Sequence, residues 1–85
     1  MSNKMQITVF IPSIDAVKNF VTTVCRYNCR VTLRSGIYAV DAKSILGVFS
    51  LDVSKPIDAI IEIGENNIDD RDDLLCAIRE YIIIT

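Results

Sequence analysis

An alternation of side chains near the start of the chain constrains the fold more than any other feature. Within Met5–Ile11, every second residue is methionine, isoleucine or valine, which is the spacing of a strand with one buried face. Ile57–Ile63 alternates with the same period directly after Pro56. Because 85 residues suffice for one domain with one core, we expect residues 1–85 to form a single domain that contains both strands.

Apolar residues at helical spacing follow the first strand. Pro12 ends that strand, and Ser13 belongs to the residue types that cap helix N-termini well. The residues that then share one helical face are Val17, Phe20, Val21 and Val24. We expect a helix that runs to about Tyr27 and is closed by Asn28 in the left-handed conformation.

A hairpin and a short helix are expected in the middle of the chain. Val31–Leu33 and Ile37–Val40 flank the turn-forming pair Ser35–Gly36, which predicts two antiparallel strands. Asp41–Ser44 then supplies polar capping groups ahead of Ile45–Phe49, a segment adequate for about two helical turns.

A third helix is expected near the end of the sequence. An acidic cluster favours a helix N-terminus there, and it consists of Asp69, Asp70, Asp72 and Asp73. The apolar stripe behind it consists of Leu74, Leu75, Ile78, Tyr81 and Ile82. For the apolar end Ile82–Ile84 we favour partial packing against the core over an oligomer contact or an aggregation-prone end.

The predicted order of elements is therefore β-α-β-β-α-β-α. This order fits an α+β fold, in which helices cover one face of a mainly antiparallel four-stranded sheet. The sequence has no internal repeat, linker or low-complexity stretch that would suggest another architecture.

Composition excludes several classes of protein. About half of the residues are hydrophobic, but no apolar run approaches the roughly 20 residues of a membrane helix. The N-terminus lacks the apolar stretch of a signal peptide, so we expect a cytoplasmic protein. The net charge of −2, without clustered lysine and arginine, argues against a nucleic-acid partner.

The cysteines do not form a recognisable site. Cys25, Cys29 and Cys76 are odd in number, and their spacings suit no disulfide framework. Zinc needs four ligands, and the chain has no histidine that could complete a set with Cys25 and Cys29. We therefore interpret the three as packing thiols and expect no metal and no other cofactor.

One segment carries a resemblance to a known family. Val40–Leu51, with the sequence Val-Asp-Ala-Lys-Ser-Ile-Leu-Gly-Val-Phe-Ser-Leu, resembles the regulatory-serine segment of the bacterial histidine-containing phosphocarrier HPr, where a lysine and a serine precede a short helix with exposed apolar side chains. The order and lengths of the other elements extend the resemblance over nearly the whole chain. It implies an HPr-like open-faced sandwich and a link to the sugar phosphotransferase system.

The position of the family's active-site histidine is occupied by another residue. By the family's spacing, counted back from Ser44, Ser13 stands at the place of the histidine and Asp15 at the place of the neighbouring arginine. A phosphocarrier needs a nucleophile that is neutral near pH 7 and forms a labile phosphoryl bond, which imidazole provides and a serine hydroxyl does not. We therefore expect no enzymatic activity and interpret Ser13 as a helix cap.

Ser44 is the candidate for regulation. The resemblance implies that it is the serine that an ATP-dependent kinase modifies in HPr of many Gram-positive bacteria, after which the protein binds a transcriptional regulator. The Crh branch of the family, which lacks the histidine but keeps the serine, is similar in this respect. The added charge would be stabilised by backbone N–H groups of the short helix and by Lys43. The alternative is that Ser44 only caps that helix.

The short helix also supplies a candidate docking surface. Ile45, Leu46 and Phe49 lie at i, i+1 and i+4, whereas Val48 and Leu51 point to a different side. The resemblance implies that the first three bind partner proteins, and exposed apolar patches usually mark interfaces. The alternative is that loops of this chain or a dimer contact cover them.

Three hypotheses for the function follow. The first is a non-catalytic interaction module that uses the face of the short helix and phosphorylation of Ser44. The second is a phosphocarrier component of the phosphotransferase system that uses a non-histidine acceptor such as Ser13. The third is a homodimer or a subunit of a larger assembly, formed through Ile82–Ile84.

Overall fold

The two alternating segments lie next to each other in one sheet. The computed structural model describes residues 3–63 and 68–83. In chain order the elements are β1 (Asn3–Val9), α1 (Ile14–Cys25), β2 (Arg30–Ser35), β3 (Tyr38–Asp41), α2 (Ile45–Phe49), β4 (Ile57–Ile63), α3 (Ile68–Ala77) and a 3₁₀ turn, η1 (Arg79–Tyr81). The strand order is β1-β4-β2-β3, and each neighbouring pair is antiparallel. The predicted α+β fold is therefore confirmed.

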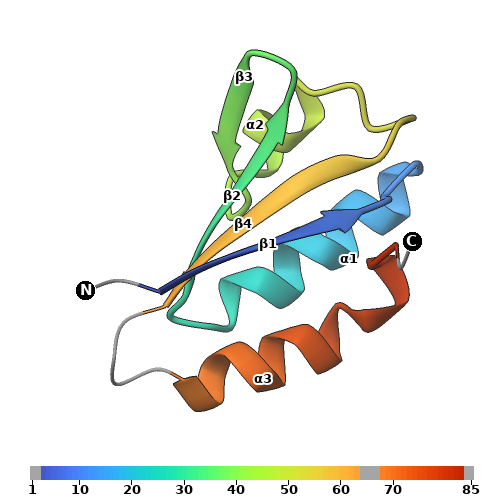
Figure 1. Cartoon of the computed structure of the whole chain (residues 1–85). Helices are drawn as coiled ribbons and strands as arrows, with labels where there is room; N and C mark the ends of the chain where they lie inside the picture. The colour runs from blue at the N-terminus through green and yellow to red at the C-terminus, as the bar shows by residue number, and fades with distance from the viewer. Residues whose placement is uncertain (1–2, 64–67, 84–85) are drawn as a thin grey trace.

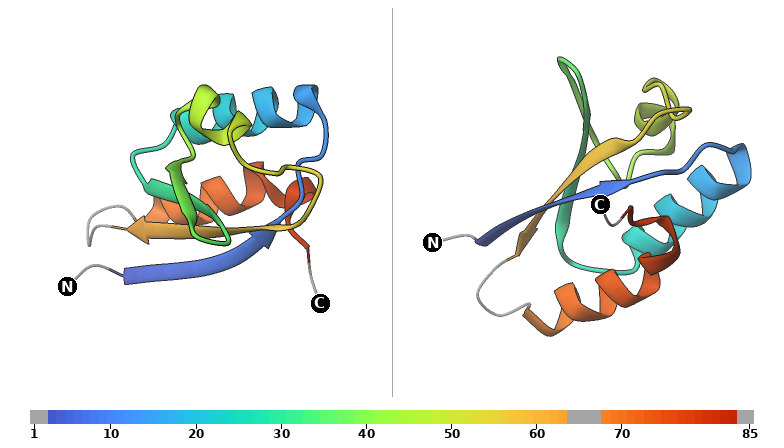
Figure 2. Two further views of the ribbon diagram at one scale, coloured as in Figure 1. Left: turned by 90° about the horizontal axis from the view of Figure 1, so that it is seen from above. Right: turned by 45° about the vertical axis from the view of Figure 1, so that its right-hand side comes forward.

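The described helices α1, α2 and α3 cover the same face of the sheet (Figure 1), and the view from above shows the two layers clearly (Figure 2). Alternate residues of the strands face this helical layer. In the central strands the fully buried ones are Val31, Leu33, Ile57, Ala59 and Ile61. The helices contribute Val17, Phe20, Val21, Val24, Val48 and Leu74 to the same core. The period of the sequence thus decides which face of each strand is buried.

The end of α1 differs from the prediction. Asn28 is not in the left-handed conformation, because no described residue other than glycine has a positive φ. Arg26 caps the helix in a right-handed conformation, and the N–H of Tyr27 donates to the carbonyl of Val24 at 3.1 Å. The Lys43 ammonium donates to the Tyr27 carbonyl at 2.7 Å, so this acceptor just beyond the helix has a partner without a left-handed residue.

The predicted hairpin between β2 and β3 is present, but its turn lies one residue later than predicted: Ser35 belongs to β2, and Gly36 and Ile37 form the turn. Gly36 has a φ of +61°, while Ile37, which follows it, has a negative φ. A positive φ at only the first central residue is typical of a type II′ turn, whose twist matches that of two antiparallel strands. The turn pairs Ser35 with Tyr38 and leaves β3 at the edge of the sheet.

The third helix is shorter than predicted. The helix ends at Ala77, so Tyr81 and Ile82 lie beyond it, in η1 and in an extended segment. Ile82 bridges Val9 of β1, and the N–H of Ile83 donates to the Thr8 carbonyl at 2.8 Å. β-branched residues favour extended backbone, and the edge of β1 offers groups to pair with. Ile82 packs against the core as favoured, and the other end of the predicted segment, Ile84, lies outside the described residues.

α2 packs closely against β3 because its middle residue is glycine. A Cβ placed on Gly47 would lie 3.3 Å from Ser44 Oγ and 3.3 Å from Val40 Cβ. A side chain at this position would require Ser44 or Val40 to move by a few tenths of an ångström. The glycine therefore sets how the loop before α2 and the helix itself sit on the domain.

Candidate functional site

Ser13 is the N-cap of α1, as the sequence predicts. Its backbone is extended, and its Oγ accepts a hydrogen bond from the N–H of Ala16 at 3.0 Å. Its carbonyl accepts from the N–H of Val17 at 3.0 Å, which is the first backbone bond of the helix. The side chain is exposed, but its oxygen already satisfies one of the free donors at the helix end.

Asp15 lies exposed in the first turn of the same helix. A carboxylate at this position interacts favourably with the positive end of the helix dipole. Its negative charge would also repel an incoming phosphoryl group, which the helix dipole alone would attract. The N-terminus of α1 thus carries a side-chain cap at Ser13 and a negative charge at Asp15.

Ser44 is the N-cap of α2 and repeats the geometry of Ser13. Its Oγ accepts from the N–H of Gly47 at 3.3 Å, and its carbonyl accepts from the N–H of Val48 at 2.9 Å. Its own N–H donates to the carbonyl of Asp41 at 3.0 Å. The side chain is exposed, so the hydroxyl is accessible from solvent.

Lys43 has a second attachment that the sequence does not reveal. Its ammonium donates to the Tyr27 carbonyl at 2.7 Å, and its N–H donates to the Asp41 carboxylate at 2.9 Å. The Cys25 thiol lies 3.7 Å from the Lys43 carbonyl. The lysine therefore links the loop before α2 to the C-terminal end of α1 as well as standing next to Ser44.

The apolar residues of the short helix divide as predicted. Leu46 is 81% exposed, and Ile45 and Phe49 are exposed to 37% and 40%. Val48 and Leu51 are buried in the core. We call the exposed set, Ile45, Leu46 and Phe49, the α2 face. The described loops leave this face open to solvent.

The three cysteines lie in different environments. Cys29 is buried in the core, whereas Cys25 and Cys76 are exposed. Within residues 3–63 and 68–83, no group of three or more histidine, cysteine, aspartate or glutamate residues is placed to hold a metal ion. In the same part of the chain, no helix is long and apolar enough to cross a membrane.

A protein-family profile matches most of the chain. The family profile described as the phosphorylation site of the PTS HPr component matches residues 14–82. The chain belongs to the HPr family. The match begins one residue after Ser13 and includes Ser44 and the whole α2 face. No curated protein matches the sequence.

Solved structures of HPr proteins have the same fold. The phosphocarrier HPr of Bacillus anthracis str. Ames superposes with a TM-score of 0.67 at 18% identity, over 91% of this chain and 96% of the other. HPr-C-His of Thermoanaerobacter tengcongensis gives 0.63 at 21% identity, over 94% and 92%. The histidine-containing phosphocarrier protein of a mycoplasma gives 0.64 at 13% identity, over 92% and 89%. The chain therefore matches nearly the full length of each.

Two exposed apolar positions were not predicted as functional in this HPr-family chain. Ile14 is 63% exposed beside Ser13, and Ile37 is 92% exposed at the tip of the hairpin. Helical spacing groups Ile14 with Val17 and Val21, at i+3 and i+7, so the sequence pattern did not reveal the exposure of this first residue of α1. The exposure of Ile37 was missed because the sequence analysis placed Ile37 in the second strand of the hairpin, whereas it lies in the turn between β2 and β3.

Proposed function

We propose that this protein is a regulatory interaction module of the HPr family, that it does not relay phosphoryl groups, and that phosphorylation of Ser44 switches its α2 face. It acts in the bacterial cytoplasm on a protein partner. The observation that carries this proposal is an exposed apolar face beside Ser44 in a sequence of 85 residues without histidine.

The chemistry of phosphoryl relay argues against a carrier role. A nucleophile must attack phosphorus while the bond to the donor breaks, and the new bond must break again when the acceptor attacks. A serine hydroxyl needs a base to take its proton, and its phosphate ester is too stable for rapid onward transfer. At Ser13 no imidazole can act as that base, and Asp15 adds a negative charge in the same helical turn.

Ser44 offers better conditions for a stable phosphate ester that acts as a signal. Its hydroxyl is exposed and already faces the N–H of Gly47. A phosphoserine carries a charge of roughly −2 and strong acceptor oxygens, which backbone N–H groups at a helix start can bind. Phosphorylation would place this charge directly beside Ile45 and Leu46 and so change which partners the α2 face accepts.

The α2 face supplies the contact area of the proposed interface. Leu46 projects almost fully into solvent, which is costly for a large apolar side chain unless a partner covers it. Phe49 adds an aromatic ring from the same helix, and aromatic residues are enriched where interfaces bind most strongly. Val48 and Leu51 anchor the helix beneath this face.

Two labelling reactions test the proposal. The protein is incubated with the general phosphotransferase enzyme and phosphoenolpyruvate, and separately with the serine kinase and ATP, and the intact mass is read. We expect one phosphoryl group in the second reaction only, and none in Ser44→Ala. The double variant Ser13→His/Asp15→Arg serves as a positive control and should gain label in the first reaction. Label from phosphoenolpyruvate that disappears in Ser13→Ala would instead support the carrier function.

A pull-down from host lysate tests the docking face. A partner recovered by the unmodified chain should be lost by Leu46→Asp, because a charge in an apolar contact is strongly unfavourable. The matched control Ile37→Asp also adds a charge at an exposed isoleucine, but on the hairpin, and should retain the partner. Equal recovery by all three proteins would contradict the proposed role of the α2 face.

A further inference from the structure

The outer edge of β3 carries main-chain groups that can pair with another strand. β3 lies at the end of the strand order, and only β2 flanks it. Directly after β3, the N–H of Ala42 donates to the Val31 carbonyl at 2.9 Å. Since hydrogen-bonded and non-bonded pairs alternate in an antiparallel ladder, Val40 also bonds to β2, and the N–H and C=O of Ala39 point outward.

The two ends of the sheet differ in this respect. At the β1 end, the N–H of Phe10 donates to the Tyr81 carbonyl at 2.8 Å, and Ile83 pairs with Thr8. The chain's own C-terminal segment thus pairs with the last part of the β1 edge. No described segment pairs with the outer edge of β3 in the same way.

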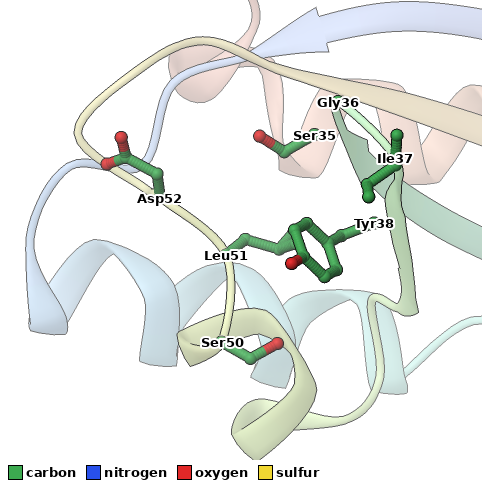
Figure 3. Close-up of a pocket in the computed structure, with 7 residues that line it drawn as sticks. All are labelled: Ser35, Gly36, Ile37, Tyr38, Ser50, Leu51 and Asp52. Atoms are coloured by element: carbon green, nitrogen blue, oxygen red, sulfur yellow. The ribbon is translucent and has the colours of Figure 1, made fainter.

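A groove lies at the turn end of the hairpin formed by β2 and β3, on the helical side of the sheet (Figure 3). Its volume is about 450 Å³, and it lies between the hairpin and the segment that follows α2. It is lined by Ser35, Gly36, Ile37, Tyr38, Ser50, Leu51 and Asp52. Tyr38 is 66% exposed, and Figure 3 shows its ring next to the Leu51 side chain. A groove of this size with an apolar wall can hold one large side chain.

The charge of the groove is negative. Asp52 is the one charged residue among those that line it. Its carboxylate accepts hydrogen bonds from Ser54, which lower the pKa of Asp52, so the group is ionised at neutral pH. Figure 3 shows the carboxylate at the rim, turned away from the Tyr38 ring. The Lys55 ammonium approaches it only to 4.0 Å, which leaves room for a second cation.

We propose that β3 binds an extended peptide segment of another protein as an added strand, with a large apolar side chain in the groove and a basic side chain near Asp52. The main-chain groups of Ala39 supply the pairing, and the groove and Asp52 supply the selectivity. This surface is separate from the α2 face, so the inference is independent of the proposed function.

A symmetric pairing of two copies centred on Val40 fits the edge less well than an extended peptide. In a symmetric pairing of two β3 strands centred on Val40, Ala39 of one copy would face Asp41 of the other. The Asp41 carbonyl already accepts the N–H of Ser44 at 3.0 Å, so it is not open to the second strand. A peptide with free choice of register can pair with Ala39 alone and place its basic residue at the acidic end of the groove.

The probe is an arrayed library of N-acetylated, C-amidated hexapeptides, followed by fluorescence anisotropy with the best binder. We expect the strongest peptides to combine an aromatic or large aliphatic residue with lysine or arginine. Their acidic counterparts, in which glutamate replaces the basic residue, should not bind. Nitrogen-15 NMR should place the shifted amide signals in Ser35–Val40 and Ser50–Asp52.

Three substitutions separate the parts of the proposed site. Ala39→Pro removes the outward N–H without removing a bond to β2 and should weaken binding about 5-fold, whereas Ala39→Ser keeps the N–H and should bind normally. Asp52→Asn should weaken binding about 3-fold and abolish the preference for a basic residue. Leu46→Asp on the α2 face should leave peptide binding unchanged.

Several results would overturn the proposal. These are the absence of binders at millimolar peptide, signals that shift on the α2 face instead, and equal selection of acidic and basic peptides. Light scattering that shows a dimer abolished by Ala39→Pro would assign the edge to a second copy. Circular dichroism of each variant checks folding, and Asp52→Asn alone still decides the charge preference if Ala39→Pro does not fold.

Discussion

The N-termini of α1 and α2 have the same kind of serine cap, but the two helices differ in length and in how many side chains they bury in the core. Ser13 and Ser44 are both exposed, and each accepts a hydrogen bond from the N–H three residues ahead. α1 then continues for 12 residues and buries four side chains, whereas α2 has five residues and buries Val48. The local geometry of a cap therefore does not reveal its role. The two helices differ instead in how many of their side chains pack into the core behind the cap.

The largest expected difference between the two helices concerns their phenylalanines. Phe20 of α1 is fully buried and packs edge-to-face on Tyr81 with ring centroids 5.8 Å apart, whereas Phe49 of α2 is partly exposed. Phe20→Ala should lower the free energy of unfolding by about 4 kcal/mol and Phe49→Ala by about 1 kcal/mol. Urea denaturation measures both. Equal losses of unfolding free energy in the two variants would show that α2 contributes to the core as much as α1 does.

The hydrogen bond between the loop before α2 and the turn after α1 should have the next largest effect on stability. Lys43→Met removes the ammonium that satisfies the Tyr27 carbonyl at the end of α1 and should cost about 1.5 kcal/mol. Lys18→Met, on the exposed side of α1, is the control and should change stability by less than about 0.5 kcal/mol. A similar small change in Lys43→Met would mean that the carbonyl is solvated equally well without the lysine.

The caps themselves should differ by a smaller amount. Ser13→Ala should cost about 1 kcal/mol, because it exposes the end of a helix on which much of the core depends. Ser44→Ala should cost about 0.5 kcal/mol, since its cap bond is longer and its helix is short. Ser13→Asn and Ser44→Asn keep a side-chain acceptor and should restore most of each loss in thermal denaturation. A larger cost at Ser44 would reverse the ranking.

The smallest effect is a dependence of stability on alkaline pH. Burial, and then the neighbouring Glu80 carboxylate, raise the pKa of Tyr81 above its ordinary value near 10. The folded protein thus holds this proton more tightly than the unfolded chain, so the free energy of unfolding is unaffected below pH 10 and falls as the pH rises through the folded pKa. Between pH 9 and pH 11, the free energy of unfolding of Tyr81→Phe should fall by a few tenths of a kcal/mol less than that of the unmodified chain. Denaturation series at several pH values measure both. An identical decline would assign the effect to other groups.

Local patterns in the sequence were sufficient for the strands and the caps. The alternation in Ile57–Ile63 depends only on which face is buried, and both serine caps depend on donors three residues away. The division between Leu46 and Val48 also follows from helical spacing alone. These features were predicted because every group they involve lies within a few residues in the chain.

Contacts between distant segments were not predictable in this way. The prediction for Asn28 was wrong: α1 ends with a right-handed cap at Arg26, and the carbonyl of Tyr27 beyond it accepts from Lys43, 16 residues further along the chain. The helical prediction for Ile82 was wrong because β1 offers an edge that only the folded sheet creates. The groove beside Tyr38 likewise needs two segments that the sequence alone does not bring together.

The glycine in the middle of α2 limits the intrinsic stability of the helix that carries the α2 face. Gly47 permits close packing on Val40, but glycine lowers the intrinsic stability of a helix by about 1 kcal/mol relative to alanine. A five-residue helix with this weakness depends on Val48 for its persistence. The surface that we propose as an interface is therefore carried by a helix of low intrinsic stability, which its packing on the sheet holds in place.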